Sequence, residues 1–207
     1  MDVKNGMLLL LVGPTASGKT TLLKELLKRR SEAARLVTAT TRAPRPGEID
    51  GKDYRFFSRE EFEQKIRDGF FLEYARVHGQ FYGTPKEEIE RALASSELVV
   101  IGVDVRGSIN IKKSFPERTV TAFILPPSSE EMLSRLKARG SESEASIRRR
   151  LKTCVNELKK MPKFDYWVTN GVIEEAVKVL DAIIIAEQNR MQRRLKTETW
   201  TIENLNV

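Results

Sequence analysis

The most informative stretch of the sequence is residues 13–20, which read Gly13, Pro14, Thr15, Ala16, Ser17, Gly18, Lys19 and Thr20. It fits the phosphate-binding loop pattern G-x-x-x-x-G-K-[S/T]. An apolar run at 7–12 precedes the loop as a buried strand would, and apolar residues recur at helical spacing over 21–28. This order of strand, loop and helix turns successive backbone N–H groups and the positive end of the helix toward one phosphate. A chance glycine-rich turn is the alternative, and these flanks argue against it.

Two side chains of this loop have direct roles in phosphate chemistry. We expect Lys19 to reach the outer phosphates of a nucleotide, and the hydroxyl of Thr20 to ligate Mg²⁺. The sequence therefore predicts a nucleotide-binding protein with Mg²⁺ as its cofactor.

The length and composition are those of one globular domain that can handle phosphorylated ligands. The chain has 207 residues and a net charge of +7, with one cysteine, Cys154, and one histidine, His78. These are too few for a disulfide framework or a structural zinc site. The charge would suit a nucleic-acid surface or small phosphorylated substrates bound by clustered arginines, so the placement of the arginines decides between them.

The chain carries no long apolar segment. Its longest apolar run, residues 7–12, is far shorter than the roughly 20 residues that span a bilayer. The sequence before the phosphate loop is also too short for a signal peptide. We therefore expect a soluble cytoplasmic protein without membrane contacts. The oligomeric state stays open, with a homodimer as one alternative.

Short apolar strands alternate with amphipathic helices along the chain, which is the rhythm of a parallel sheet covered on both faces. The predicted fold class is α/β, with a five-stranded parallel core sheet flanked by helices. The candidate strands are 7–12, 35–39, 98–103, 119–125 and 166–169.

We expect the chain, 1–207, to form a single domain. Its core is predicted to consist of 1–37, 91–139 and 151–207, and two further segments lie between these parts. The first, 38–90, is predicted to form a small lobe. The chain has nine Phe and four Tyr residues, and nine of these thirteen fall between Tyr54 and Tyr82. The second, 140–150, is predicted to form a lid, because Gly140 ends a helical pattern and small polar residues follow it.

Three predicted helix starts carry the spacing of a capping box, in which Glu follows a Ser or Thr by three residues. The pairs are Ser58 with Glu61, Thr84 with Glu87, and Ser128 with Glu131. A further helical pattern covers 173–195. Its basic end is expected to be a solvated face rather than a nucleic-acid site.

Arg42 and Arg45 lie three residues apart in a proline-rich loop that directly follows a predicted strand. In parallel sheets the carboxyl ends of the strands face the ligand crevice. Arginine binds phosphate through paired hydrogen bonds, so the pair is a candidate site for a second phosphate. Taken alone, two solvated loop arginines would fit the same pattern equally well.

Further motifs follow at intervals that together resemble one family. They are 51–54 (GKDY), 69–74 (GFFLEY), 78–85 (HGQFYGTP) and 123–128 (FILPPS). With the phosphate loop and the arginine loop, they make residues 8–180 closely resemble the guanylate kinases, a family of P-loop nucleoside monophosphate kinases. The resemblance implies an enzyme that transfers the γ-phosphate of ATP to GMP, with dGMP as a second acceptor.

The resemblance also implies a role for each matching residue. GMP would be held at its phosphate by Arg42, Arg45, Tyr54 and Tyr82, and at its base by Thr38, Glu73, Thr84 and Asp104. ATP would be bound by the phosphate loop 13–20 with Thr21, Arg135 and Asn170. Catalysis would fall to Lys19, Arg42, Arg139 and Arg150, with Arg135, Arg139 and Arg150 converging on the phosphates when the lid closes. For Thr84, helix capping alone would explain the residue equally well.

The sequence departs in three places from the pattern that the family implies. Gly102 stands where an acidic residue is usual, two positions before Asp104. Arg106 replaces a common glutamine, and Gly171-Val172 replaces an acidic pair after Asn170. The change at Gly102 removes a carboxylate from the neighbourhood of the phosphates, which could loosen Arg42 or the water shell of Mg²⁺ and alter turnover or substrate preference.

Three other functions fit parts of the sequence. A P-loop kinase for another small phosphorylated acceptor, such as ribose 1,5-bisphosphate, need not keep Glu73, Tyr54 and Tyr82. A guanylate-kinase-like module that binds proteins typically loses the lysine of the phosphate loop, whereas Lys19 is present. A GTPase is suggested by D-x-x-G at 104–107, yet no N-K-x-D motif follows it.

Overall fold

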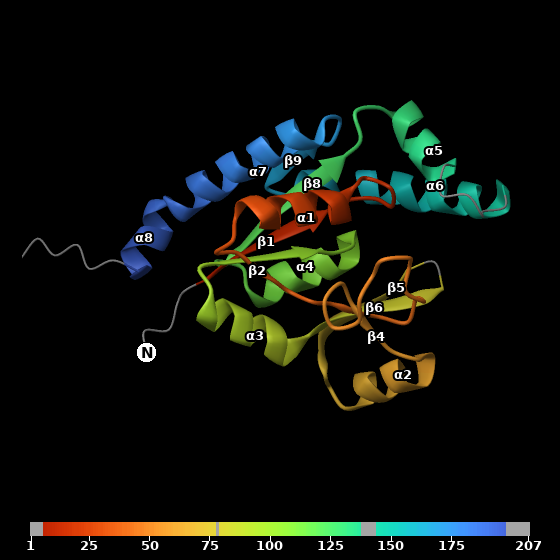
Figure 1. Ribbon diagram of the computed structural model, residues 1–207, viewed down its shortest axis with the longest axis horizontal. Helices are drawn as coiled ribbons and strands as arrows, with labels where there is room; N and C mark the ends of the chain where they lie inside the picture. The colour runs from red at the N-terminus through yellow and green to blue at the C-terminus, as the bar shows by residue number, and fades with distance from the viewer. Residues whose placement is uncertain (1–5, 78, 138–143, 198–207) are drawn as a thin grey trace, which may run out of the picture.

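Two β-sheets organise the chain in the computed structural model, which describes residues 6–77, 79–137 and 144–197 (Figure 1). The larger sheet has five parallel strands in the order β2-β7-β1-β8-β9. They are β1 (Met7–Val12), β2 (Ala34–Arg35), β7 (Leu98–Gly102), β8 (Thr119–Leu125) and β9 (Tyr166–Thr169). The predicted α/β class and the five-stranded parallel core are confirmed.

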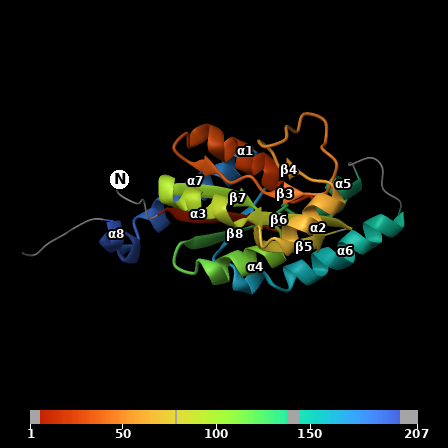
Figure 2. The same ribbon diagram turned by 90° about the horizontal axis from the view of Figure 1, so that it is seen from below.

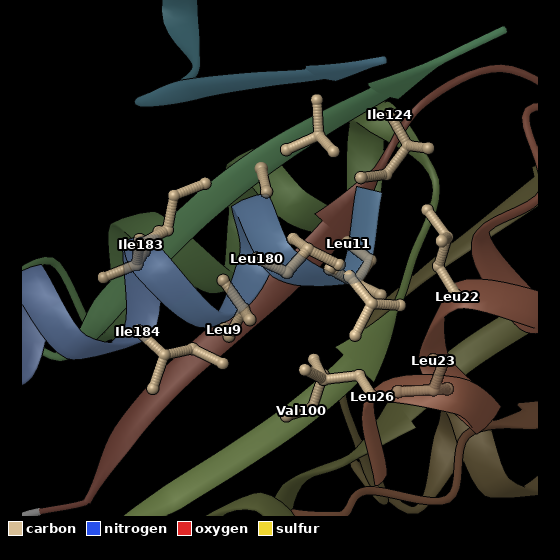
Figure 3. Close-up of a cluster of buried hydrophobic side chains, with 14 of the residues drawn as sticks. Leu9, Leu11, Leu22, Leu23, Leu26, Val100, Ile124, Leu180, Ile183 and Ile184 are labelled. Carbon is tan, nitrogen blue, oxygen red and sulfur yellow. The ribbon is translucent and has the colours of Figure 1, made fainter. Parts of the chain in front are cut away.

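Strand β1 lies at the centre of this sheet and is buried along its whole length. Successive side chains of a strand point to opposite faces, so a run of apolar residues can meet helices on both sides. Leu9 and Leu11 pack with α1 (Lys19–Arg29) and α7 (Ile173–Gln188), as Figure 3 shows, whereas Leu8 joins the cluster on the opposite face. The central strand therefore anchors both layers of helices.

Helices cover both faces of the core sheet (Figure 2). On one face, Arg30 at the end of α1 forms an ion pair with Asp181 of α7 at 2.9 Å, which fixes the two helices against each other. On the other face lie α3 (Lys86–Ser95) and α4 (Val105–Ser114). The remaining core segments are α5 (Ser129–Lys137), α6 (Glu144–Leu158), the 3₁₀ turn η1 (Met161–Lys163) and α8 (Met191–Thr197).

The second sheet and helix α2 form a lobe beside the core (Figure 1). Its strand order is β4-β3-β6-β5, and the β3–β4 pair is parallel while the other pairs are antiparallel. Phe62 of α2 is fully buried and stacks on Phe71 and Phe81, with ring centroids 4.3 Å and 5.3 Å away. This stacking joins helix to sheet and gives the clustered aromatic residues a structural purpose. The elements are β3 (Ala39–Thr40), β4 (Arg55–Phe56), α2 (Arg59–Arg67), β5 (Phe71–Val77) and β6 (Gln80–Pro85).

The predicted strand 35–39 is wrong as one element, because the chain changes sheets within it. β2 pairs with β7 in the core, whereas β3 pairs with β4 and β6 in the lobe. Between them, Leu36 N still donates to Val100 O at 3.1 Å, and Thr38 O already accepts from Arg55 N at 2.8 Å. The backbone N–H and C=O groups of this segment thus form hydrogen bonds first with the core sheet and then with the lobe sheet. The lobe begins at this change of sheets.

The capping box predicted from the sequence forms completely at the start of α2. At the start of α5, the hydrogen bond to the Ser128 side chain is formed. Glu61 N donates to Ser58 Oγ at 3.1 Å, and Ser58 N donates to Glu61 Oε2 at 2.7 Å, which completes the box. At α5, Glu131 N donates to Ser128 Oγ at 3.1 Å.

The capping box predicted for Thr84 and Glu87 is wrong. Thr84 lies in β6, and α3 begins at Lys86 without a side-chain cap from Pro85. The Thr84 hydroxyl instead donates to Glu73 Oε1 at 2.7 Å. Sequence spacing could not reveal this, because the partner lies on the neighbouring strand.

Residues 140–143 of the predicted lid, Gly140 among them, lie outside the described residues, and from residue 144 the predicted segment belongs to α6. Arg139, just before the lid, also lies outside the described residues. The helical pattern predicted for 173–195 is divided between α7 and α8. Within the described ranges, no helix combines the length and the apolar character needed to cross a membrane.

The core packing predicts a large loss of stability from one buried position of α7. Leu180 is fully buried, so Leu180→Ala should lower the free energy of unfolding by about 3 kcal/mol through the cavity that it leaves. The adjacent Val179 is 45% exposed, and Val179→Ala should change stability by less than about 0.5 kcal/mol. Urea unfolding followed by circular dichroism measures both variants. Equal losses would contradict the assigned packing of α7.

Candidate active site

A cavity of about 560 Å³ opens where the phosphate loop, the lobe, the end of β7 and α6 come together. All eight residues predicted to bind GMP line it: Thr38, Arg42, Arg45, Tyr54, Glu73, Tyr82, Thr84 and Asp104. The cavity is also lined by residues of the predicted ATP site and of α6: Gly13, Thr15, Ala16, Gly18, Lys19, Thr20, Thr21 and Arg150. Segments that are far apart in the sequence thus line a single cavity.

The phosphate loop curls because three of its residues have positive φ angles. These are Gly13 at 144°, Ala16 at 68° and Gly18 at 89°. Glycine adopts such angles readily, whereas the alanine does so at a cost of about 1 kcal/mol. Lys19 Nζ donates to the carbonyl oxygens of Gly13 at 2.6 Å and Pro14 at 2.9 Å. The ammonium group therefore lies against the loop whose N–H groups are expected to hold phosphate.

Asn170, directly after β9, supports the phosphate loop from behind. Its Nδ2 donates to Ser17 O at 2.8 Å, and Arg135 Nη2 donates to Asn170 O at 3.1 Å. A Cβ atom at Gly18 would overlap the Asn170 amide, so the close approach requires glycine. Asn170 Oδ1 is buried and has no hydrogen-bond partner within the described part of the chain. Pro14, Ser17, Arg135 and Asn170 do not line the cavity, and their contacts with ATP stay predictions.

The arginine loop is held by Glu48, a residue to which the sequence analysis gave no role. Arg42 Nη2 donates to both carboxylate oxygens of Glu48, at 2.9 and 2.8 Å, and Arg45 N donates to the same carboxylate at 2.8 Å. Burial acts to lower the pKa of Arg42, but Glu48 raises it above its usual value overall. A carboxylate three residues beyond Arg45 in a proline-rich loop was the signal that could have found it.

Asp53 ties the loop that carries Tyr54 to the core. It is 7% exposed and accepts hydrogen bonds from Ile49 N at 3.0 Å and Arg35 Nη1 at 3.2 Å. Burial would raise the pKa of Asp53, but these donors lower it overall, so the residue is a buried, paired carboxylate. Tyr54 then lies edge-on to Tyr82 at 6.4 Å between ring centroids. Burial, reinforced by Tyr82, raises the pKa of the Tyr54 hydroxyl, which keeps it protonated as a donor.

Glu73 of β5 presents a buried carboxyl group to the cavity and is 9% exposed. A β-bulge between Phe71 and Glu73 shifts the register and sets Glu73 opposite Thr84, the hydrogen-bond donor described above. Burial raises the pKa of Glu73 to about 7; the Thr84 hydrogen bond opposes the shift, and the charge of Asp104 adds to it. Such a carboxyl group suits a ligand edge that carries several N–H groups.

The D-x-x-G spacing at 104–107 has a structural explanation. Asp104 Oδ1 caps α4 by accepting from Arg106 N at 2.7 Å and Gly107 N at 2.9 Å. A Cβ atom at Gly107 would lie 2.8 Å from Glu73 Oε2, so glycine there leaves room for the Glu73 carboxylate. No local sequence pattern links Gly107 with Glu73, because the two residues lie on different elements.

Helix α6 brings Arg150 and Glu157 to the cavity. Arg150 was predicted as a site residue, whereas Glu157 was not, since a glutamate inside an amphipathic helix carries no motif of its own. Arg139 lies outside the described residues, and its catalytic role stays a prediction.

The donor set at the start of α1 fits Mg²⁺. Thr20 lines the cavity directly after Lys19, and Mg²⁺ prefers oxygen ligands such as hydroxyl groups and phosphates. Because Mg²⁺ usually keeps several waters, it needs only one or two ligands from the protein beside those of a nucleotide.

Comparison with known proteins agrees with this geometry. The guanylate kinase family profile matches residues 5–187. The chain belongs to the guanylate kinase family. It is 44% identical to a guanylate kinase of Caldanaerobacter subterraneus subsp. tengcongensis over 92% of each chain, and 42% identical to one of Clostridioides difficile over 93% of this chain and 94% of that one. The crystal structure of guanylate kinase from Anaplasma phagocytophilum superposes with a TM-score of 0.77 at 33% identity, covering 93% of this chain and 92% of the other.

The close approach of Asn170 to Gly18 predicts an unusually costly substitution in this member of the guanylate kinase family. Gly18 and Gly51 both have positive φ, 89° and 72°, but a Cβ atom at Gly51 meets nothing. Gly51→Ala should therefore lose about 1 kcal/mol of unfolding free energy, and Gly18→Ala about 3 kcal/mol, since Asn170 must also move. Urea unfolding measures both. A loss at Gly18 no larger than at Gly51 would show that Asn170 does not constrain the loop.

Proposed function

We propose that this chain transfers the γ-phosphoryl group of MgATP to GMP, giving ADP and GDP, with dGMP as a second acceptor. One observation carries the proposal: a single cavity is lined by Lys19 of the phosphate loop and by the buried Glu73 of the lobe. The first suits a nucleoside triphosphate, and the second suits guanine. Membership of the guanylate kinase family supports the same pairing.

At the donor end, the chain supplies positive charge and alignment. Lys19 and the N-terminus of α1 would hold the outer phosphates, while Mg²⁺, bound with Thr20, would neutralise part of the charge on the transferred group. Arg150 adds a cation from α6. Arg135 and Arg139 would join it as the lid closes and excludes water. The acceptor phosphate attacks directly, so no covalent intermediate on the protein is required.

At the acceptor end, Arg42 and Arg45 would bind the phosphate of GMP together with the hydroxyl groups of Tyr54 and Tyr82. Glu48 holds the Arg42 guanidinium in place before the ligand arrives. Such preorganisation reduces the ordering that binding would otherwise require.

The base would be read by Glu73. A carboxylate can accept both the N1–H and the N2 amino group of guanine, whereas adenine has no proton at N1 and would leave the buried carboxylate unpaired. Thr84 fixes one carboxylate oxygen, which orients the pair of acceptors. Thr38 and Asp104 line the same cavity and would complete the contacts to the base.

The alternatives explain less of the cavity. A kinase for a sugar phosphate would have no use for a buried carboxylate paired with Thr84. A protein-binding module would have no need of Lys19 and Arg150 at one cavity with the four residues proposed to bind the acceptor phosphate.

The proposal is tested by measuring ADP release with GMP, dGMP, AMP and ribose 1,5-bisphosphate as acceptors. GMP should give the highest kcat/KM, and AMP should be at least about a thousandfold poorer because it leaves Glu73 unpaired. Lys19→Met is the matched negative control and should lose nearly all turnover. Turnover with another acceptor but none with GMP would refute the proposal.

The buried Glu73 also predicts how the KM for GMP depends on pH. The charged carboxylate accepts the guanine protons, and its pKa of about 7 means that this form is lost as the pH falls through 7. The KM for GMP should therefore rise below neutral pH, by up to about tenfold per unit.

Glu73→Gln should remove the contribution of the Glu73 carboxyl group to the pH dependence of the KM for GMP. Only the contribution from titration of the GMP phosphate should then be left. KM profiles for GMP measured with both proteins separate the two effects. Identical profiles would show that Glu73 does not read the base.

A further inference from the structure

The phosphate end of the cavity lacks a side chain at Gly102. This residue ends β7 and lines the cavity with Lys19 and Thr20. A Cβ atom built at Gly102 would meet nothing within 4 Å. The strand end therefore offers open space beside the phosphate loop where a carboxylate could stand.

A different carboxylate, that of Glu157, reaches this region from α6. Glu157 and Arg150 are seven residues apart, two turns of helix, so they lie on the same face, and both line the cavity. Cys154, between them, is buried and contacts Met132 of α5 with its Sγ 3.2 Å from the Met132 sulfur. Ala16 of the phosphate loop belongs to the same buried cluster. This end of α6 is thus packed on the loop and on α5, which holds the helix that carries Glu157 beside the phosphate loop.

The charges around Glu157 connect it to the phosphate loop. Burial raises the pKa of Glu157 to about 7, the Lys19 ammonium opposes the shift, and the Asp104 carboxylate adds to it. Glu157 and Lys19 also line the same cavity, so the carboxyl group lies at the end of the site where the lysine is expected to contact the outer phosphates. Lys19 is already oriented on its other side by the carbonyl oxygens of Gly13 and Pro14.

We propose that Glu157 is a positioning residue for Lys19 and supplies, from α6, the negative charge that Gly102 leaves out of the phosphate end of the cavity. The inference rests on the proposed phosphoryl transfer for its effect on turnover. It has a second consequence that does not depend on turnover. A carboxylate beside the phosphates repels metal-free ATP more than MgATP, because the metal-free form carries more negative charge.

The first test measures steady-state kinetics of Glu157→Gln, an isosteric change that removes the charge. The kcat should fall by roughly tenfold or more while the KM for GMP stays within about threefold, since the acceptor contacts are untouched. Gly102→Asp introduced into this variant should restore at least part of the kcat, because it places a carboxylate in the open space on β7. Glu90→Gln, at an exposed position of α3, is the matched control and should behave as wild type.

A kcat of Glu157→Gln within about twofold of wild type would overturn the inference, and so would a loss that Gly102→Asp leaves unchanged. Urea midpoints of all variants separate these outcomes from misfolding, which a charge-removing isostere should not cause.

The second test measures the dissociation constants of ATP with and without Mg²⁺ by calorimetry. Glu157→Gln should lower the preference for MgATP over metal-free ATP by about threefold or more relative to wild type. An unchanged preference would overturn the inference. This readout stands even if wild-type protein phosphorylates no acceptor, so failure of the proposed reaction and failure of the role of Glu157 are distinguishable.

Discussion

Strand β1 is buried between two layers of helices, and its position sets those of the phosphate loop and of the segments packed around it. Because its side chains are covered on both faces, the strand has one position in the sheet, and Gly13 must begin the phosphate loop at its carboxyl end. Asn170, from the end of β9, then supports the back of that loop through Ser17. The donor end of the site is therefore positioned by the buried centre of the core.

The acceptor end depends on how the lobe is attached. The chain leaves the core sheet after β2 and enters the lobe sheet at β3, and buried Asp53 bonds back to Arg35 at this junction. Within the lobe, the bulge in β5 turns Glu73 toward Thr84, while the aromatic stack around Phe62 supports the strands. Neither end of the cavity would face the other without this junction.

Local sequence patterns predicted the elements that local chemistry determines. The apolar run of β1, the phosphate loop and the cap at Ser58 each depend on neighbouring residues, and each is where the pattern indicated. Contacts across the fold were beyond such patterns. The strand predicted at 35–39 is shared by two sheets, Thr84 donates to Glu73 rather than capping α3, and Glu157 reaches the cavity only because α6 packs beside the phosphate loop. Glu48 differs, because its partners Arg42 and Arg45 lie in the same loop and local spacing could have indicated it. Resemblance to the family selected eight residues for GMP that all line the cavity, whereas four of those selected for ATP do not line it. It did not select the partners that orient these side chains.

The central claim is that the phosphate loop and Glu73 form two halves of one site for two nucleotides. A crystal structure of the protein with ADP, Mg²⁺ and GMP tests this most directly. We expect the ADP phosphates on the loop at 13–20 and the guanine edge hydrogen-bonded to Glu73, with the GMP phosphate between Arg42 and Tyr82. GMP bound outside this cavity, or bound in it with the base turned away from Glu73, would contradict it.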